Sequence, residues 1–225
     1  MKIDTLHDGG YVRLVNWMGQ DIDIVRAARV SYDGDTKCGE DPEADAKLIR
    51  YLMKNKHTSP FESCQLTFEI KCPMFVARQW HRHRTWSYNE VSARYTELDM
   101  GYYVPKAGHV GTQNRDNKQM RDIDAADPED DLQKRKLIDT ANLLAFNAYR
   151  KLMEMGTPRE LARSVLPAAT YTRFYGSVNL HNLFHFVRLR IHEHSQYEIR
   201  VYAEAILEIC QKRYPVATKA FMETL

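Results

Sequence analysis

Apolar and polar side chains alternate strictly over residues 64–71. The apolar positions are Cys64, Leu66, Phe68 and Ile70, and the polar positions between them are Gln65, Thr67, Glu69 and Lys71. A period of two residues places one set on each face of a β-strand. We therefore predict a half-buried strand of an antiparallel sheet, with Cys64 as a small core residue.

Apolar residues in several other segments recur at steps of three and four, which is the period of a helix with one buried face. Asp41 and Pro42 supply an N-cap and a first-turn proline for a helix that ends near Lys54. Further helices are predicted over residues 73–83, 137–155, 157–166, 179–193 and 196–213. The 157–166 helix is expected to begin with the capping box Thr157-Pro158-Arg159-Glu160.

These elements predict an α+β fold, an antiparallel or mixed sheet with helices packed on it, in a single domain over residues 1–225. A further strand is predicted at residues 102–104. Residues 105–130 are the most polar stretch of the chain and include an acidic run near their end. A loop this long inside a compact domain is usually a lid or a disordered excursion. We favour a lid, and the disordered excursion remains open.

Composition narrows the class of protein. Of the 225 residues, 44% are hydrophobic and 28% are charged, as in ordinary globular proteins. The 32 basic and 30 acidic side chains give a net charge of +2, whereas a protein that wraps nucleic acid is usually more basic. No signal-like segment and no long apolar run occurs, which predicts a cytoplasmic protein without membrane contact. The four cysteines lack zinc-site spacing and are expected to be reduced.

Directional polar groups are densest in residues 82–95, Arg-His-Arg-Thr-Trp-Ser-Tyr-Asn-Glu-Val-Ser-Ala-Arg-Tyr. Guanidinium groups match the geometry of phosphate, and hydroxyl and amide groups fix the rest of such a ligand. A solvated, charged connector is the alternative for a short basic stretch. The interleaved hydroxyls and the carboxylate of Glu90 favour a nucleotide site.

Arginines and histidines elsewhere extend this interpretation. Arginines occur in or beside segments that otherwise look buried or capped: Arg82, Arg84, Arg94, Arg163, Arg173, Arg188 and Arg190. Structural ion pairs would need many buried carboxylates, each with a desolvation cost, so a shared anionic ligand is simpler. His181 and His185 have a zinc-ligand spacing, but the glutamate of an HExxH helix is missing, and no metal is predicted.

The segment Arg82-His83-Arg84, followed after seven residues by Ser92, resembles the signature of the flavin-dependent thymidylate synthases. Other segments resemble that family in the same order, namely residues 57–62, 162–167 and 179–190, so that the likeness covers about residues 10–215. The GxGxxG fingerprint of dinucleotide-binding folds is absent. The resemblance therefore implies FAD held mainly by side chains, and the aromatic residues near the signature are expected to wall a flavin or pterin ring: Trp80, Trp86, Tyr88 and Tyr95.

The resemblance also implies roles for individual residues. Those expected to bind the nucleotide are Gln79, Arg82, Glu90, Val91, Ser92, Ala93, Arg94, Arg163 and Arg190. Those expected to bind the flavin are Ser59, Arg82, His83, Arg84, Glu90, Asn179, His181 and His185. The family commonly has arginine at position 181, which weakens a phosphate role for the histidine here. The implied catalytic residues are Arg190, His57 and Ser92.

Within this set the resemblance assigns the uridylate phosphate to Arg94 and Arg163. It places Arg190 against the uracil ring, where a guanidinium favours the N3-deprotonated base and directs electron density towards C5. Ser92 has no neighbouring general base and is expected to orient the substrate. Glu90 is open to two interpretations, a ligand contact or a pair with Arg94.

The implied reaction is the conversion of dUMP to dTMP, with 5,10-methylenetetrahydrofolate as carbon donor, NADPH as reductant and FAD as the redox cofactor. The uracil would be activated by arginine rather than by a cysteine nucleophile. The family likeness further implies a homotetramer with active sites shared between subunits. Two alternatives remain from the residues alone: a nucleic-acid-binding module that uses the basic and aromatic stretch, and a metal-dependent hydrolase that uses the C-terminal histidines.

Overall fold

A five-stranded antiparallel sheet forms the centre of the fold, in the order β1-β2-β3-β7-β4. The computed structural model describes residues 1–32, 38–123 and 127–225. The strands are β1 (Lys2–Asp4), β2 (Tyr11–Met18), β3 (Gln65–Pro73), β7 (Tyr171–Asn179) and β4 (Ser87–Glu90). β3 pairs along its whole length with β7, from Gln65 opposite Asn179 to Pro73 opposite Tyr171.

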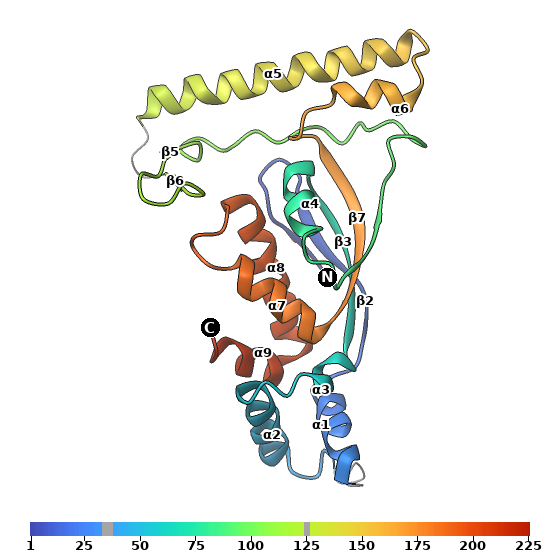
Figure 1. Cartoon of the computed structure of the whole chain (residues 1–225), viewed down its shortest axis with the longest axis vertical. Coiled ribbons are helices and arrows are strands. Elements are labelled where there is room, and N and C mark those ends of the chain that lie inside the picture. Colours follow the sequence, from blue (N-terminus) through green and yellow to red (C-terminus); the bar gives the residue numbers. More distant parts are fainter. Residues whose placement is uncertain (33–37, 124–126) are drawn as a thin grey trace.

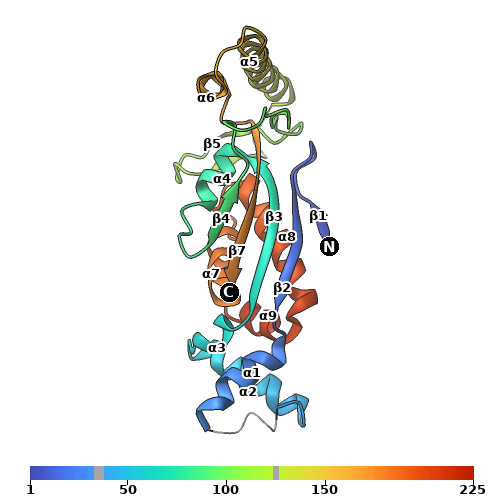
Figure 2. The same ribbon diagram turned by 90° about the vertical axis from the view of Figure 1, so that its right-hand side faces the viewer.

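The strand predicted over residues 64–71 is confirmed, and its apolar face is closed. Each of the four apolar positions is at most 1% exposed: Cys64, Leu66, Phe68 and Ile70. The helices α4 (Met74–Trp80), α7 (Leu180–Arg190) and α8 (Tyr197–Arg213) pack on one side of the sheet (Figures 1 and 2). The predicted α+β class with an antiparallel sheet is therefore confirmed.

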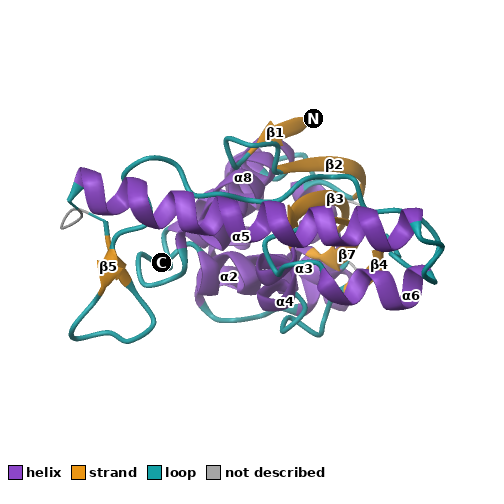
Figure 3. Ribbon diagram, turned by 90° about the horizontal axis from the view of Figure 1, so that it is seen from above, coloured by secondary structure: helices purple, strands orange, loops and turns teal. Residues whose placement is uncertain are grey.

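Different helices lie at the two ends of the sheet. Where β3 begins, the chain forms α1 (Asp21–Arg29), α2 (Pro42–Lys54), α3 (Ser59–Glu62) and α9 (Pro215–Met222). At the opposite end, where β7 begins, lie α5 (Pro128–Glu154) and α6 (Arg159–Ala162) (Figure 1). Seen from above, α5 crosses the whole width of the molecule (Figure 3). The length of β3 therefore separates two groups of helices.

Aromatic side chains fill the space between the sheet and α7. Trp80 is fully buried and stacks on Phe186 with ring centroids 4.6 Å apart, and Trp86 meets both rings edge-on. The expectation that Trp80 and Trp86 wall a bound ring is wrong, because both are 5% exposed or less and belong to the protein core. Tyr88 is half-buried and Tyr95 is 80% exposed.

Several helix boundaries differ from the prediction for local reasons. The 41–54 helix is confirmed, with the Asp41 carboxylate accepting from the backbone N–H groups of Glu43 and Ala44. α5 uses the same device at Asp127 and Pro128, so the acidic run is its first turn rather than part of a loop.

Three further predictions need correction. α4 ends at Trp80, three residues early, because the chain turns there towards β4. The capping box at 157–160 is absent, since Pro158 is the N-cap of α6 and no side chain caps it, and α6 continues only as the 3₁₀ turn η3 (Arg163–Val165). Residues 102–104 form one isolated bridge, Tyr102 to Thr170, rather than a strand.

The polar stretch 105–130 contains a hairpin, β5 (Thr112–Gln113) paired with β6 (Arg121–Asp122). The start of the 105–130 stretch is held against α5, because the carboxylate of Asp131 on α5 accepts hydrogen bonds from the backbone N–H groups of Gly108 and Val110. Residues 124–126 lie outside the described part of the chain. The lid interpretation of this stretch stays a prediction.

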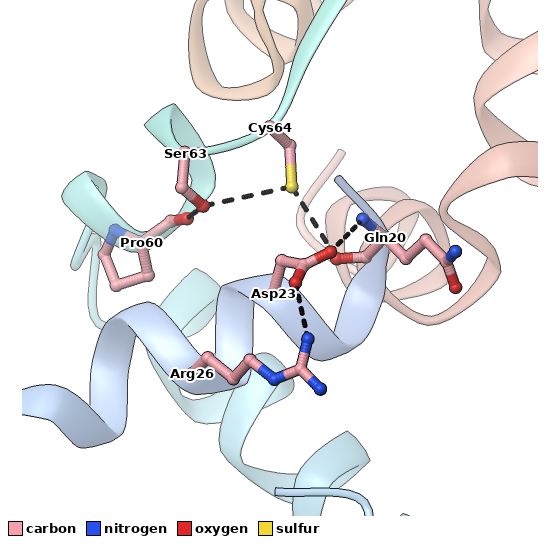
Figure 4. A network of polar contacts seen from close by, with 6 residues as sticks. All are labelled: Gln20, Asp23, Arg26, Pro60, Ser63 and Cys64. Atoms are coloured by element: carbon pink, nitrogen blue, oxygen red, sulfur yellow. Dashed lines mark hydrogen bonds and ion pairs between the residues drawn. The ribbon is translucent and has the colours of Figure 1, made fainter. Parts of the chain in front are cut away.

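A polar network joins α1 to the start of β3 (Figure 4). The Asp23 carboxylate accepts from the backbone N–H of Gln20 at 2.8 Å and pairs with Arg26 at 2.9 Å. The Cys64 thiol donates to the Gln20 carbonyl at 3.6 Å, and burial raises the pKa of this thiol to about 11. Cys64 is thus a protonated core residue, as the alternating pattern predicted.

Candidate active site

A cavity of about 950 Å³ opens beside α4 at the upper end of β3, and we call it the arginine cavity. Arg78 lies on α4 and Arg82 in the turn that follows the helix, and both line the cavity. Six of the predicted nucleotide-binding residues lie in its wall: Arg82, Glu90, Val91, Ser92, Ala93 and Arg163. Segments separated by some 70 residues in the sequence therefore meet in one depression, as the shared-ligand interpretation requires.

The charges of the arginine cavity are only partly balanced within the chain. Three arginines line it against the two carboxylates of Glu90 and Glu160. Glu90 accepts a hydrogen bond from the hydroxyl of Thr172, and Glu160 lies 3.8 Å from the guanidinium of Arg94. The interpretation of Glu90 as a partner of Arg94 is wrong, because β4 ends at Glu90 and Arg94 turns towards α6. Unbalanced guanidinium groups suit an anionic ligand.

The loop after β4 gives the cavity its second polar wall. The Ser92 hydroxyl accepts from the backbone N–H of Arg94 at 3.2 Å, which fixes the turn that follows the strand. Arg163 lies at the junction of α6 and η3, where its Nε donates to the Glu160 carbonyl at 3.3 Å. Within the described ranges its other guanidinium donors make no hydrogen bond, so they can bind a ligand. Both residues are thus held by short-range contacts in their own loops.

Arg190, the predicted catalytic arginine, ends α7 and reaches back to α4. Its Nε donates to His83 Nε2 at 3.0 Å, and its Nη2 donates to the Gln79 carbonyl at 3.4 Å. An acceptor nitrogen on His83 requires the neutral ring. Burial lowers the pKa of His83 to about 4, with Arg190 and His185 contributing in the same direction. The guanidinium is therefore fixed by an uncharged neighbour and keeps its charge available for a ligand.

A second cavity of about 510 Å³ lies at the lower end of β3, and we call it the histidine cavity. It brings the predicted flavin residues His181 and His185 of α7 together with His57, predicted as catalytic, from the loop before α3. Phenylalanine rings and cationic side chains complete its wall: Phe61, Phe184, Phe221, Lys54, Lys56 and Arg188. Arg188 is tied to Thr224 by hydrogen bonds from both of its terminal nitrogens.

The two cavities lie towards opposite ends of β3. His57 precedes the strand, and Arg82 lies in the turn that follows α4. A strand rises about 3.3 Å per residue, so β3 is roughly 30 Å long. The cavities approach each other more closely along α7, because the ring of His185 in the histidine cavity lies 6.3 Å from that of His83, the residue next to Arg82. One chain thus presents two cavities with separate walls.

The remaining predicted residues lie outside the wall of the arginine cavity. Ser59 is exposed at the start of α3, and Arg84 is exposed after α4. Asn179 caps α7, because its side-chain Oδ1 accepts a hydrogen bond from the backbone N–H of Asn182 at 2.9 Å. Gln79 directs its side chain to Gln196. For Arg173 the structural interpretation holds, since it pairs with Glu69 on the sheet at 3.4 Å.

Several residues of the arginine cavity were not predicted as site residues, including Arg78, His81, Glu160, Ser164 and Thr172. The helical spacing of Arg78 and Arg82 is a signal that could have identified Arg78. His81 is notable because its Nε2 is buried without a hydrogen-bond partner among the described residues. Thr172 lies on β7, a strand that the sequence pattern did not reveal.

Other chemistries find little support in the described residues. Within the ranges 1–32, 38–123 and 127–225, no group of three or more His, Cys, Asp or Glu side chains could hold a metal ion. Burial raises the pKa of the thiols of Cys64, Cys72 and Cys210, which makes them poor nucleophiles. No helix in the described ranges has the length and apolar character needed to cross a bilayer.

Comparisons with known proteins agree with this geometry. The family model of the thymidylate synthase complementing protein matches residues 13–216. Flavin-dependent thymidylate synthases of Wolbachia pipientis and Thermus thermophilus are each 49% identical, over 219 residues (96% of this chain and 75% of the relative) and 218 residues (97% and 77%). The enzyme of that name from Ehrlichia ruminantium (strain Gardel) is 47% identical over 216 residues (96% and 71%).

A solved structure is also similar, the UMP/dUMP methylase PolB from Streptomyces cacaoi bound with 5-Br dUMP. It is 36% identical, aligns over 94% of both chains and has a TM-score of 0.86. The resemblance read from residues 82–95 is confirmed by these matches. With a family model spanning most of its length and relatives near half identity, this chain belongs to the flavin-dependent thymidylate synthase family.

Proposed function

We propose that this chain is a flavin-dependent thymidylate synthase that converts dUMP to dTMP, with 5,10-methylenetetrahydrofolate as carbon donor and NADPH as reductant. The observation that carries the proposal is the arginine cavity, in which Arg82, Glu90, Ser92 and Arg163 line one polar depression. Three arginines against two carboxylates suit a nucleoside monophosphate. The names of the relatives support the same reaction.

In this proposal dUMP binds with its phosphate near Arg163 and Arg94, at the outer end of the arginine cavity. Ser92 orients the nucleoside, and the backbone at Val91 and Ala93 completes the contact. Arg190 contacts the pyrimidine and stabilises negative charge on the ring, which raises the electron density at C5. Neutral His83 supports this role, because it fixes the guanidinium without neutralising it.

FAD binds, in this proposal, against the histidine cavity and the segment Arg82-His83-Arg84. The cavity combines phenylalanine rings with lysine, arginine and histidine side chains, which fits a cofactor that has an apolar ring system and an anionic pyrophosphate. When bound, the flavin supplies hydride chemistry that no side chain of this protein can supply. The chain's own residues bind, orient and exclude water.

The separation of the cavities supports a homotetramer with shared active sites. The arginine cavity and the histidine cavity share no wall residue within one chain, so a second copy that brings its own surface to this place would complete a site for both rings. Apolar side chains without cover on α5 and α6 offer an interface: Leu137 is 71% exposed, Leu144 64% and Leu161 61%. Exposed apolar groups of this kind mark interaction surfaces.

Purified protein tests the reaction directly. We expect a yellow preparation with absorbance near ~450 nm that NADPH bleaches, and dTMP formation only when the folate is present. UMP should be assayed beside dUMP, because the similar solved structure is named as a methylase of both. A colourless protein that binds oligonucleotides with a steep salt dependence would replace this proposal with the nucleic-acid alternative.

Mixing two inactive variants tests the shared sites. Arg190→Ala removes the pyrimidine contact, and the double variant His57→Ala/His185→Ala removes flavin contacts at the other end of the chain. We expect co-expressed subunits to regain activity above either parent, because some sites then receive an intact half from each copy. Activity no higher than the parents would show that each site is built within one chain.

A further inference from the structure

We propose that Glu198 is a positioning residue that sets the side-chain amide of Gln79 through Gln196, so that Gln79 presents a hydrogen-bond acceptor to the nucleoside beside Arg190. The inference rests on the proposed function, because it takes the nucleotide to bind next to Arg190. It assigns a task to a hydrogen-bonded chain that begins at the β5–β6 hairpin and ends at α4.

The central group of this hydrogen-bonded series is a buried carboxylate. Glu198 lies in the first turn of α8 and is 1% exposed. Its Oε1 accepts from the Tyr103 hydroxyl at 3.0 Å and from Arg121 Nη2 of β6 at 2.8 Å. Its Oε2 accepts from Gln196 Nε2 at 2.9 Å. A carboxylate paired with a guanidinium offers only acceptors, so it fixes the direction of every bond that it makes.

Glu198 thereby fixes the orientation of two side-chain amides, first that of Gln196 and then that of Gln79. Because Gln196 must direct its NH₂ group at Glu198, its carbonyl oxygen faces the other way and accepts from Gln79 Nε2. Gln79 must therefore direct its own NH₂ group at Gln196, which leaves Gln79 Oε1 as the free atom. Reversing either amide would place acceptor against acceptor or donor against donor.

The backbone of Gln79 is in contact with the predicted catalytic arginine. Arg190 Nη2 donates to the backbone carbonyl of Gln79 at 3.4 Å. In the described part of the chain, no group donates to Gln79 Oε1. Arg190 and Gln79 are thus neighbours, and in this inference the nucleoside binds where both the guanidinium and Gln79 Oε1 can reach it. A pyrimidine nucleoside carries the complementary groups, carbonyl oxygens and hydroxyl or N–H donors.

A double-mutant cycle on dUMP affinity tests the proposal. Glu198→Gln replaces the carboxylate by an amide of the same shape that can turn either way. We expect the dUMP dissociation constant of the flavin-loaded enzyme to rise about fivefold with Glu198→Gln and about tenfold with Gln79→Ala. In the Gln79→Ala background, Glu198→Gln should add less than about twofold, because the group through which it acts is gone.

The matched control is Glu204→Gln, the same substitution on the same helix at an exposed residue that pairs with Arg200 at 3.7 Å. It should leave dUMP affinity unchanged. If Glu198→Gln does not fold, as judged by thermal melting and flavin content, Gln196→Ala interrupts the chain at an exposed position and enters the same cycle. Equal effects in both Gln79 backgrounds would show a purely structural role and overturn the inference. A wild-type enzyme that binds no dUMP would instead remove the proposed function, and this inference with it.

Discussion

The arginine cavity and the histidine cavity lie at opposite ends of β3 and differ in their chemistry. The first is lined by three arginines, two carboxylates and the loop after β4. The second is lined by three phenylalanines and three histidines, with cationic side chains around them. Charge with directional hydroxyls suits a nucleotide, and rings edged with cations suit a flavin. In the proposed function the chain therefore recognises its two ligands with separate surfaces, and substitutions in one surface should leave binding at the other intact.

Arg190→Ala should have the largest effect. Loss of the guanidinium removes stabilisation of charge on the pyrimidine, and deleting one such preorganised donor lowers kcat by about 10²–10³-fold. FAD should remain bound, because Arg190 does not line the histidine cavity. Turnover and flavin content, measured on the same preparation, test whether activity is lost while FAD stays bound. Arg150→Ala, an exposed arginine paired with Asp99 at 3.1 Å, is the control. Full turnover in Arg190→Ala would contradict the role.

Arg163→Ala should weaken dUMP binding by about 10–100-fold, the range for losing a hydrogen bond to a charged group. The expected change lies mainly in the dUMP KM, with kcat at saturation nearly unchanged. Titration of the flavin spectrum with dUMP measures the affinity directly. Arg159→Ala is the control, because Arg159 is close in sequence but exposed, and its guanidinium lies 4.0 Å from Glu97. An unchanged dUMP affinity would place the phosphate elsewhere.

Acid should destabilise the segment that joins the two regions. The pKa of His83 is about 4 in the folded protein against an ordinary value near 6.5, so the unfolded state binds the proton first. The neutral ring therefore stabilises the fold fully above pH 6.5, and this contribution is lost as pH falls towards 4. Between pH 7.5 and pH 5 the free energy of unfolding should fall by about 2 kcal/mol on this account.

Urea unfolding at the two pH values measures this loss. His83→Gln should remove about 2 kcal/mol of the pH dependence, because glutamine does not titrate. The control is His192→Gln, at an exposed histidine of the α7–α8 loop. An equal fall in stability in wild type and His83→Gln would assign the acid sensitivity to other groups.

The sequence predicts some parts of this molecule better than others, for physical reasons. β3 and α2 were predicted correctly because their signals are local, a two-residue alternation and an Asp-Pro start. β7 was missed since it is buried on one face by α4 and α7 and interrupted by Gly176, whose neighbour Trp86 leaves no room for a side chain. Burial alternates along residues 171–179, but two of the buried positions are Thr172 and Gly176, so the alternation is weak when read as apolar and polar residues.

The same limit applies to the candidate site. The 82–94 signature identified five of the fifteen wall residues of the arginine cavity, because these five are close together in the sequence. His81, Glu160 and Thr172 could not be predicted, since they join the wall only through the packing of α4, α6 and β7. The sequence also suggested that all the arginines meet, whereas Arg188 belongs to the other cavity and Arg173 to an ion pair on the sheet.

His57→Ala should give the smallest effect and the sharpest separation of the two surfaces. His57 is exposed at the edge of the histidine cavity and meets Tyr51 edge-on, with ring centroids 5.8 Å apart. Loss of one ring contact to a flavin costs about 0.5–1.5 kcal/mol, so FAD affinity should fall roughly 2–10-fold while dUMP affinity stays constant. His7→Ala is a matched control, because His7 makes a similar edge contact with Tyr103 at 6.2 Å outside both cavities. FAD binding of the apoprotein followed by fluorescence measures the change. A loss of dUMP affinity equal to the loss of FAD affinity would mean that the two surfaces act as one, and the division drawn along β3 would fail.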